Sequence, residues 1–165
     1  MDLSFKDQKA RRMVCLPLDG LATVYDVSAR VQELSPVVGL FKIGKETFTR
    51  FGPEAVRVVQ SYGADVFLDL KYHDIPNTVR GAADAATQLG VRMFNVHASG
   101  GLEMMQAAVE GARNGAEKYK VEVPKIIAVT VLTSIDQKML NNQLRVPGKV
   151  EEQVYIKPNW HIKQD

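Results

Sequence analysis

Residues 65–78 read DVFLDLKYHDIPNT, a stretch in which a strand, a turn and the start of a helix follow one another. Residues 65–72 are largely apolar, as in strands that are buried in a parallel sheet. Pro76 keeps the residue before it extended, and Asn77 is a suitable cap for a helix over 78–89 that ends before a glycine. The stretch therefore predicts one strand–helix unit of an α/β protein.

The same strand-then-helix unit recurs along the chain. Apolar runs and helical periodicity predict further strands at 14–19, 39–44, 93–98 and 125–132, and helices at 24–34, 53–62 and 102–112. Ser134 with Gln137 matches a capping box for a fifth helix, and residues 150–156 resemble the start of another. Strands at intervals of about 25 to 32 residues, with helices between them, are typical of a parallel sheet with right-handed crossovers.

Two architectures fit this alternation. One is a (β/α)₈ TIM barrel, which typically takes about 250 residues. The other is a flavodoxin-like binding module, an open five-stranded sheet that 165 residues can complete. Length favours the open sheet, whereas the motifs described below favour an incomplete barrel of about five β/α units. The barrel predicts strands in sequential order, and the open sheet predicts an order that reverses once.

Composition excludes several classes of protein. The chain carries 21 Lys and Arg against 19 Asp and Glu, a net charge of +2. It therefore lacks the excess of positive charge that is typical of proteins that bind nucleic acid or an anionic membrane. Its longest apolar run, 126–132, is far below the roughly 20 residues of a membrane helix. The single cysteine excludes a disulfide framework, and the three histidines lack metal-ligand spacing. We expect a cytoplasmic protein without a metal site.

Charged residues in and after the 65–72 strand are the strongest candidates for chemistry. Side chains alternate between the faces of a strand, so Asp69 and Lys71 share one face. Asp74 follows three residues later. The carboxyl ends of parallel strands are where α/β folds place their sites, and buried charges are costly unless they are paired.

Two further charges occupy equivalent positions in other units. Asp19 ends the first predicted strand, and Lys42 lies within the apolar run GLFKIG, where it needs partners such as Asp69. Flanking carboxylates are expected to hold Lys71 protonated, which suits it to donate a proton or to stabilise a carbanion. The alternative is an ion-pair network that only stabilises the mouth of the fold.

These residues resemble a known family. LDLKYHDIPNTV is similar to the Asp-x-Lys-x-x-Asp signature of the orotidine 5'-monophosphate decarboxylases, and PLDG, GLFKIGKETF, MFNVHASGG and AVTVLTS match as well. The resemblance covers residues 13–155 in order. Related sugar-phosphate decarboxylases, which need Mg²⁺, share the signature, but the IPNT that follows it and the GLFKIG run favour the orotidylate branch.

The resemblance implies a homodimeric (β/α)₈ lyase that converts orotidine 5'-monophosphate to UMP and CO₂ in de novo pyrimidine biosynthesis, without metal or organic cofactor. It implies that Lys71 is the proton donor to C6 of the pyrimidine and that Asp69 lies beside the substrate carboxylate and bonds Lys71. Lys42 and Asp19 would contact the ribose hydroxyls, and Lys42 would also belong to the charged network.

The resemblance further implies a site shared between two protomers. Asp74 and Thr78, with Ile75 beside them, would reach into the partner's site. Thr133, or else Ser134, would lie near the base. Ser134 has the N-cap interpretation as its alternative.

The same resemblance suggests three regions. Residues 1–12 are expected to be a polar N-terminal extension, 13–156 a partial decarboxylase barrel, and 157–165 a divergent, non-native tail. The strands that hold the substrate phosphate in barrel enzymes would follow the fifth unit. We therefore expect the chain alone to be feeble or inactive, or else to be a non-catalytic fragment that associates with another chain.

Overall fold

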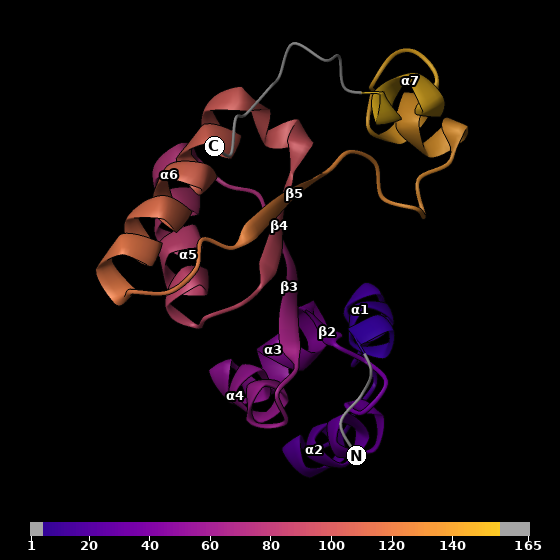
Figure 1. Ribbon diagram of the computed structural model, residues 1–165. Helices are drawn as coiled ribbons and strands as arrows, with labels where there is room; N and C mark the ends of the chain where they lie inside the picture. The colour runs from indigo at the N-terminus through magenta and orange to yellow at the C-terminus, as the bar shows by residue number, and fades with distance from the viewer. Residues whose placement is uncertain (1–4, 156–165) are drawn as a thin grey trace.

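The strands form one parallel sheet whose spatial order is the sequence order, β1-β2-β3-β4-β5. The computed structural model describes residues 5–155. The strands are β1 (Cys15–Pro17), β2 (Leu40–Gly44), β3 (Asp65–Tyr72), β4 (Met93–His97) and β5 (Lys125–Val129). This order confirms the prediction of consecutive β/α units (Figure 1). The flavodoxin-like alternative, which requires a reversal in the order, is wrong.

Helices alternate with the strands along the chain. They are α1 (Phe5–Met13), α2 (Val24–Leu34), α3 (Lys45–Phe51), α4 (Pro53–Ser61), α5 (Pro76–Gln88), the 3₁₀ turn η1 (Ala98–Gly100), α6 (Gly101–Tyr119), the π-helical turn η2 (Met139–Gln143) and α7 (Val150–Val154). The helices α3–α6 lie on one side of the sheet, whereas α1 and α7 lie on the other side of the strands (Figure 1). Within residues 5–155, none of the helices combines the length and the apolarity needed to cross a bilayer.

The predicted elements agree with these bounds to within a few residues at most ends. The strand 65–72 and the helix 24–34 are confirmed as predicted. The helix expected over 102–112 continues to Tyr119, because its buried small and apolar residues recur at helical spacing beyond Ala112. The predicted tail, 157–165, lies outside the described residues.

The expected cap of the helix after β3 is wrong. α5 begins at Pro76, and the residue at its N-cap is Ile75, which makes no side-chain cap bond. Asn77 instead accepts a hydrogen bond from Arg80, at 3.1 Å. Proline suits the first position of a helix because its φ is already helical and its missing N–H needs no partner there.

The capping box predicted from Ser134 and Gln137 is also wrong. No α-helix begins at Ser134. Helical backbone begins at residue 137 and continues into the turn η2, and the carboxylate of Asp136 accepts the backbone N–H of Met139 at 2.7 Å. The side chain of Gln137 points elsewhere, donating to Asn141 at 2.6 Å.

Two helices, α1 and α3, are not among those predicted from the sequence. The polar N-terminal segment is in fact helical from Phe5 and contacts the sheet. The carbonyl of Arg11 accepts the N–H of Gly39 at 2.8 Å, and the guanidinium of Arg11 donates to the carbonyl of Ser35 at 2.6 Å. A Cβ at position 39 would lie 2.8 Å from the Arg11 carbonyl oxygen, so glycine permits this contact.

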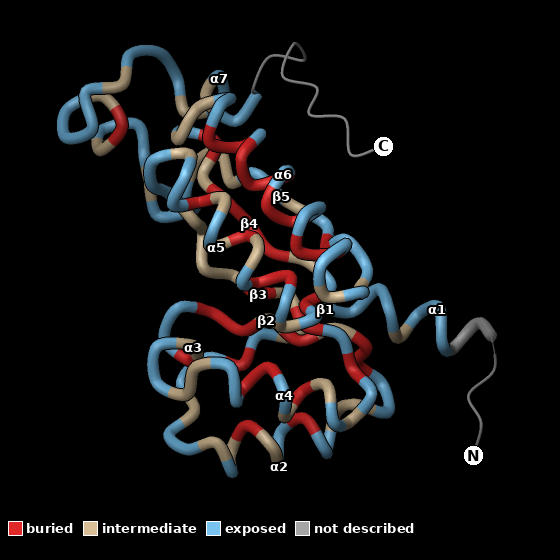
Figure 2. Tube along the Cα trace, turned by 90° about the vertical axis from the view of Figure 1, so that its left-hand side faces the viewer, coloured by how far each residue is buried: buried red, intermediate tan, exposed pale blue. Residues whose placement is uncertain are grey.

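The two faces of the sheet differ in character. The side chains packed beneath the helices are apolar and almost fully buried: Phe41, Ile43, Val66, Leu68, Phe94 and Val96. Figure 2 shows buried residues along β2–β4 and on the helix sides facing them. Residues alternating with these point to the opposite face, where Lys42, Asp69 and Asn95 lie. The helical layer therefore stabilises the fold, and the opposite face holds the charged side chains.

Two glycines bring α5 and α6 into close contact. A Cβ at Gly111 would lie 2.2 Å from the backbone oxygen of Arg80, and one at Gly115 would lie 3.1 Å from Thr87. Backbone atoms cannot move aside as a flexible side chain can, so position 111 requires glycine.

We predict that Gly111→Ala lowers the free energy of unfolding by roughly 1–3 kcal/mol, because the added methyl group overpacks the α5–α6 contact. Gly81→Ala is the matched control, since Gly81 is an exposed glycine of α5 with no atom near its Cβ position. The control should raise the free energy of unfolding by about 1 kcal/mol through helix propensity. Urea unfolding measures both, and equal effects of the two substitutions contradict the packing argument.

Candidate active site

Four charged side chains of alternating sign meet at the carboxyl ends of β1, β2 and β3. Lys42 Nζ lies 3.0 Å from Asp19 Oδ2 and 3.4 Å from Asp69 Oδ2. Lys71 Nζ lies 2.5 Å from Asp69 Oδ1. The four groups form one continuous network, Asp19–Lys42–Asp69–Lys71, which we call the charge network. Spacing predicted each of its members.

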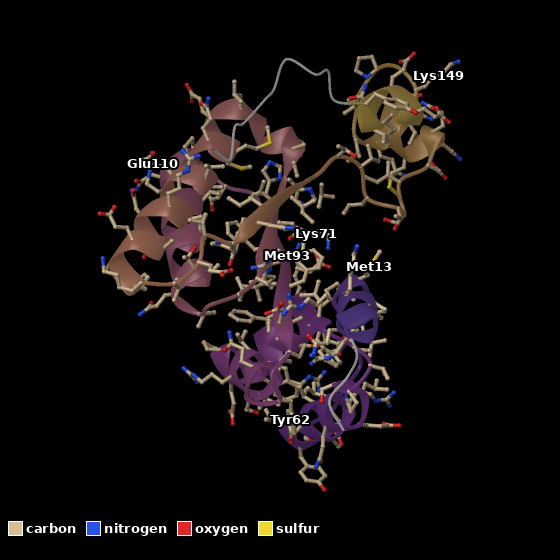
Figure 3. The ribbon with its side chains drawn as sticks, viewed as in Figure 1. Met13, Tyr62, Lys71, Met93, Glu110 and Lys149 are labelled. Atoms are coloured by element: carbon tan, nitrogen blue, oxygen red, sulfur yellow. The ribbon has the colours of Figure 1, made fainter. Side chains whose placement is uncertain are left out.

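The centre of this charge network is more shielded than its outer end. The side chain of Asp69 is 13% exposed, those of Lys42 and Lys71 are 21% and 25% exposed, and that of Asp19 is 50% exposed. Lys71 lies on the opposite side of the strands from Glu110 of α6 (Figure 3). The pair Asp69–Lys71 is thus neither in bulk solvent nor far from Lys42, as its proposed chemistry requires.

A bulge in β3 presents Asp69 and Lys71. Leu68 pairs with Phe94 and Tyr72 pairs with Val96, so three residues of β3 lie opposite one residue of β4, Asn95. Lys71 has φ 52°, in the left-handed region that non-glycine residues rarely adopt. Bulges commonly redirect side chains beside active sites, and alternation alone does not predict this one.

Asn95 fills the gap that the bulge leaves in the strand pairing. Its Oδ1 accepts the backbone N–H of Lys71 at 2.7 Å, and its Nδ2 donates to Asp69 Oδ1 at 2.6 Å. The residue is 3% exposed. Sequence reasoning missed this role, although an asparagine within the apolar run MFNVHA was an available signal.

Gly44 lets Asp19 and Lys42 approach each other. A Cβ at this position would lie 2.7 Å from Asp19 Oδ1 and 3.2 Å from Lys42 Nζ. The end of β1 is also fixed to β2 and its following helix, since Leu18 donates to the carbonyl of Lys42 at 2.9 Å and accepts from the buried hydroxyl of Thr47. The charge network is therefore constrained by backbone as well as by side chains.

Burial raises the pKa of the Asp69 carboxyl, but hydrogen bonds from Lys71 and Asn95 and the charges of Lys71 and Lys42 outweigh it, so the net pKa lies below its usual value. Asp69 is thus ionised at neutral pH. The pKa of His97, at the end of β4, is lowered by burial and then by the charges of His73, Lys45 and Lys71. The site therefore combines the two carboxylates and two ammonium groups of the charge network with a nearby neutral imidazole.

The remaining predicted residues do not join the charge network. Asp74, Ile75 and Thr78 are exposed at the start of α5, and the Asp74 carboxylate accepts the N–H of Ile75 at 2.7 Å. Thr133 and Ser134 are exposed in the turn after β5. No hydrogen bond within the described part of the chain links these five residues to Asp69 or Lys71, so their roles stay predictions.

A cavity of about 310 Å³ lies beside His97, between the end of β4 and the segment after β5. His73 also lines it, with its ring centroid 5.3 Å from that of His97. The segment after β5 lines it with residues that include Thr130, Val131 and Leu132 but not Thr133. Across residues 5–155, no three His, Cys, Asp or Glu side chains gather as they would around a metal ion.

The comparison with known families decides the classification. The family described as Orotidine 5'-phosphate decarboxylase / HUMPS matches residues 12–159. The chain belongs to this family. An orotidine 5'-phosphate decarboxylase from Moorella thermoacetica is 54% identical over 124 residues, which are 75% of this chain and 49% of that protein. The corresponding protein from Syntrophus aciditrophicus is 46% identical over 140 residues, 85% of this chain and 56% of its own length.

Solved structures of the decarboxylase family agree with this assignment. The crystal structure of orotidine 5'-phosphate decarboxylase from Lactobacillus acidophilus has a TM-score of 0.77 at 36% identity, covering 86% of this chain and 62% of that one. The enzyme from Thermotoga maritima, with a TM-score of 0.57 at 21% identity, shares the fold. The chain spans about half the length of the curated relatives it matches.

We predict that the pKa of the Asp69 carboxyl lies below the usual aspartate value of about 3.9, because Lys71, Asn95 and Lys42 favour its ionised form. A lowered pKa in the folded state stabilises the fold above the unfolded-state value, and this stabilisation is lost as pH falls through the folded value. Carboxyl ¹³C NMR gives the pKa, and urea unfolding between pH 2 and 6 gives the stability.

Asp69→Asn removes this titration, so its stability difference from the unaltered chain should shrink as the solution is acidified. Asp65→Asn, at the exposed start of β3, separates this local effect from the loss of one negative charge. If the difference in stability between Asp69→Asn and the unaltered chain grows as the pH falls, the prediction of a lowered Asp69 pKa is wrong.

Proposed function

We propose that the chain provides the charged part of an orotidine 5'-monophosphate decarboxylase site, at which the substrate loses CO₂ and becomes UMP in pyrimidine biosynthesis. The observation that supports this most directly is the placement of Asp69 between two ammonium groups, 2.5 Å from Lys71 and 3.4 Å from Lys42. Family membership supports the same reaction. The absence of a disulfide framework from the sequence is in keeping with a cytoplasmic setting.

Lys71 is the group that performs the chemistry. When the bond between C6 and the carboxylate breaks, CO₂ leaves and the electron pair remains on C6. The ammonium of Lys71 stabilises that charge and then transfers a proton from Nζ to C6. Because Asp69 and the β3 bulge already hold Lys71 in place, little reorganisation is needed during the reaction.

Asp69 has two roles in this proposal. It fixes the Lys71 ammonium, and it lies where the substrate carboxylate must approach, so the two negative charges repel each other. Repulsion of this kind is a contested explanation of rate. We give the greater weight to the ammonium, because its attraction grows as negative charge develops on C6.

The other predicted site residues bind the nucleotide. Asp19 and Lys42 contact the ribose hydroxyls, and Thr133 lies near the base. Asp74 and Thr78 reach into the site of a second copy, with Ile75 beside them. A site shared in this way makes a homodimer the active form in this proposal. The exposure of these residues at the start of α5 leaves them accessible to such a partner.

We predict that Lys71→Ala lowers turnover of orotidine 5'-monophosphate at least about 10³-fold, since it removes both the stabilising charge and the proton donor. Lys118→Ala, on the helical side of the sheet, should leave turnover unchanged. The loss of absorbance as UMP forms measures both. The chain matches about half of the Moorella thermoacetica protein. Each variant is therefore assayed both by itself and in the presence of the remaining half of that protein.

Absence of turnover under both conditions contradicts the proposal, as does a Lys71→Ala chain that keeps a tenth of the activity. A sugar-phosphate decarboxylase, the alternative within the same family, requires Mg²⁺. Activity that survives a chelator therefore argues for the orotidylate reaction, whereas activity on a sugar phosphate that the chelator abolishes argues for the alternative.

A mixing experiment tests the shared site. Lys71→Ala and Asp74→Ala are each expected to be inactive, but a mixed dimer would hold one site with an intact Lys71 and an intact Asp74 from the other protomer. An equal mixture should regain about a quarter of full activity, since half of the dimers are mixed and each has one complete site. No regain of activity in a mixture shown to contain mixed dimers contradicts a shared site.

A further inference from the structure

We infer that Asn95 is a positioning residue that holds Asp69 and Lys71 in their reactive arrangement. This rests on the proposed function for its consequence in catalysis, but the arrangement itself can be tested without turnover. Asn95 contacts both members of the pair, through the side chain of one and the backbone of the other.

The bulge creates the need for such a residue. Residues 69–71 lie opposite Asn95 alone, so the N–H of Lys71 cannot pair with β4 in the regular way. An unpaired buried N–H destabilises the arrangement. The Oδ1 of Asn95 accepts this N–H at 2.7 Å and so supports the left-handed backbone of Lys71.

The other end of the amide acts on the carboxylate. Nδ2 donates to Asp69 Oδ1 at 2.6 Å, the same oxygen that Lys71 Nζ contacts at 2.5 Å. Asp69 Oδ1 therefore receives two donors while Oδ2 faces Lys42. The amide supplies the donor and the acceptor from two separate atoms, whereas a carboxylate lacks the donor and an aliphatic side chain lacks both.

The position of Asn95 is itself rigid. The residue is 3% exposed, and its neighbours Phe94 and Val96 are buried beneath the helices. Its amide is held between two partners, which fixes the amide orientation. The ionisable groups that act on Asp69 are Lys71 of β3 and Lys42 of β2, with the thiol of Cys15 on β1 also within electrostatic range. Asn95 adds a hydrogen bond to Asp69 without adding a charge.

The first test uses the unaltered 165-residue chain. Side-chain amide signals of Asn95 are followed by NMR as the solution is acidified. We expect them to shift with the same midpoint as the Asp69 carboxyl signal, because protonation weakens the hydrogen bond between them. Asn95 signals that ignore the Asp69 titration overturn the inference.

Variants separate the two hydrogen bonds. Asn95→Asp keeps an acceptor for the Lys71 N–H but replaces the donor with a like charge, so the pKa of Asp69 should rise while the exchange of the Lys71 amide stays slow. Asn95→Ala removes both bonds, and its Lys71 amide should exchange at least about tenfold faster. Asn114→Asp, on the exposed side of α6, adds the same charge far from the site and should change neither measurement.

A residue that merely fills space would not move the Asp69 titration in Asn95→Asp, and that result overturns the inference. If Asn95→Ala does not fold, Asn95→Asp and the unaltered chain still decide it. Turnover adds a separate readout: Asn95→Asp should lower kcat by about tenfold or more, with less effect on KM. If no variant and not even the unaltered chain turns over substrate, the proposed reaction is contradicted. If the NMR results differ from those expected, the inference about Asn95 is contradicted.

Discussion

The ion pairs of Asp69 are the interaction on which the site depends. A carboxylate that is 13% exposed is costly to shield from water unless cations and donors surround it. Asp69 has Lys42 on one oxygen and Lys71 on the other, and Asn95 donates to it as well. Without this negative charge, two ammonium groups would face each other across the same small space. Asp69 is therefore needed to hold Lys42 and Lys71 close together, whatever reaction the site performs.

The backbone is shaped to allow these contacts. A left-handed conformation at a non-glycine residue costs about 1–2 kcal/mol, and Lys71 adopts one. Hydrogen bonds from its backbone and its ammonium offset that cost locally. Gly44 contributes in a different way, because it leaves out the methyl group that would displace Asp19. Strain in one strand and a missing side chain in the next thus serve the same charge network.

Periodicity predicted most of the fold because burial controls it. The helix 24–34 has its apolar residues on one face, and the strand 65–72 places Asp69 and Lys71 on one side, so both were predictable. The bulge was not, since it depends on an asparagine 24 residues away from Lys71 in the sequence. The cap at Asn77 failed for a local reason: Pro76 begins the helix two positions before the predicted start at residue 78. The spacing of residue types along the chain does not reveal contacts with distant residues, nor which of two competing local signals prevails.

The separation of the two faces of the sheet explains how this fold can carry an unfavourable cluster of charges. Phe41, Leu68 and Phe94 are fully buried beneath the helices, and this apolar layer supplies the main stabilisation. Lys42 and Asp69 occupy alternate positions of the same strands and point the other way. The strands β2, β3 and β4 thus each contribute apolar side chains to the core and polar side chains to the site. Substitutions on the charged face can alter the chemistry while the packing that maintains the sheet is left in place.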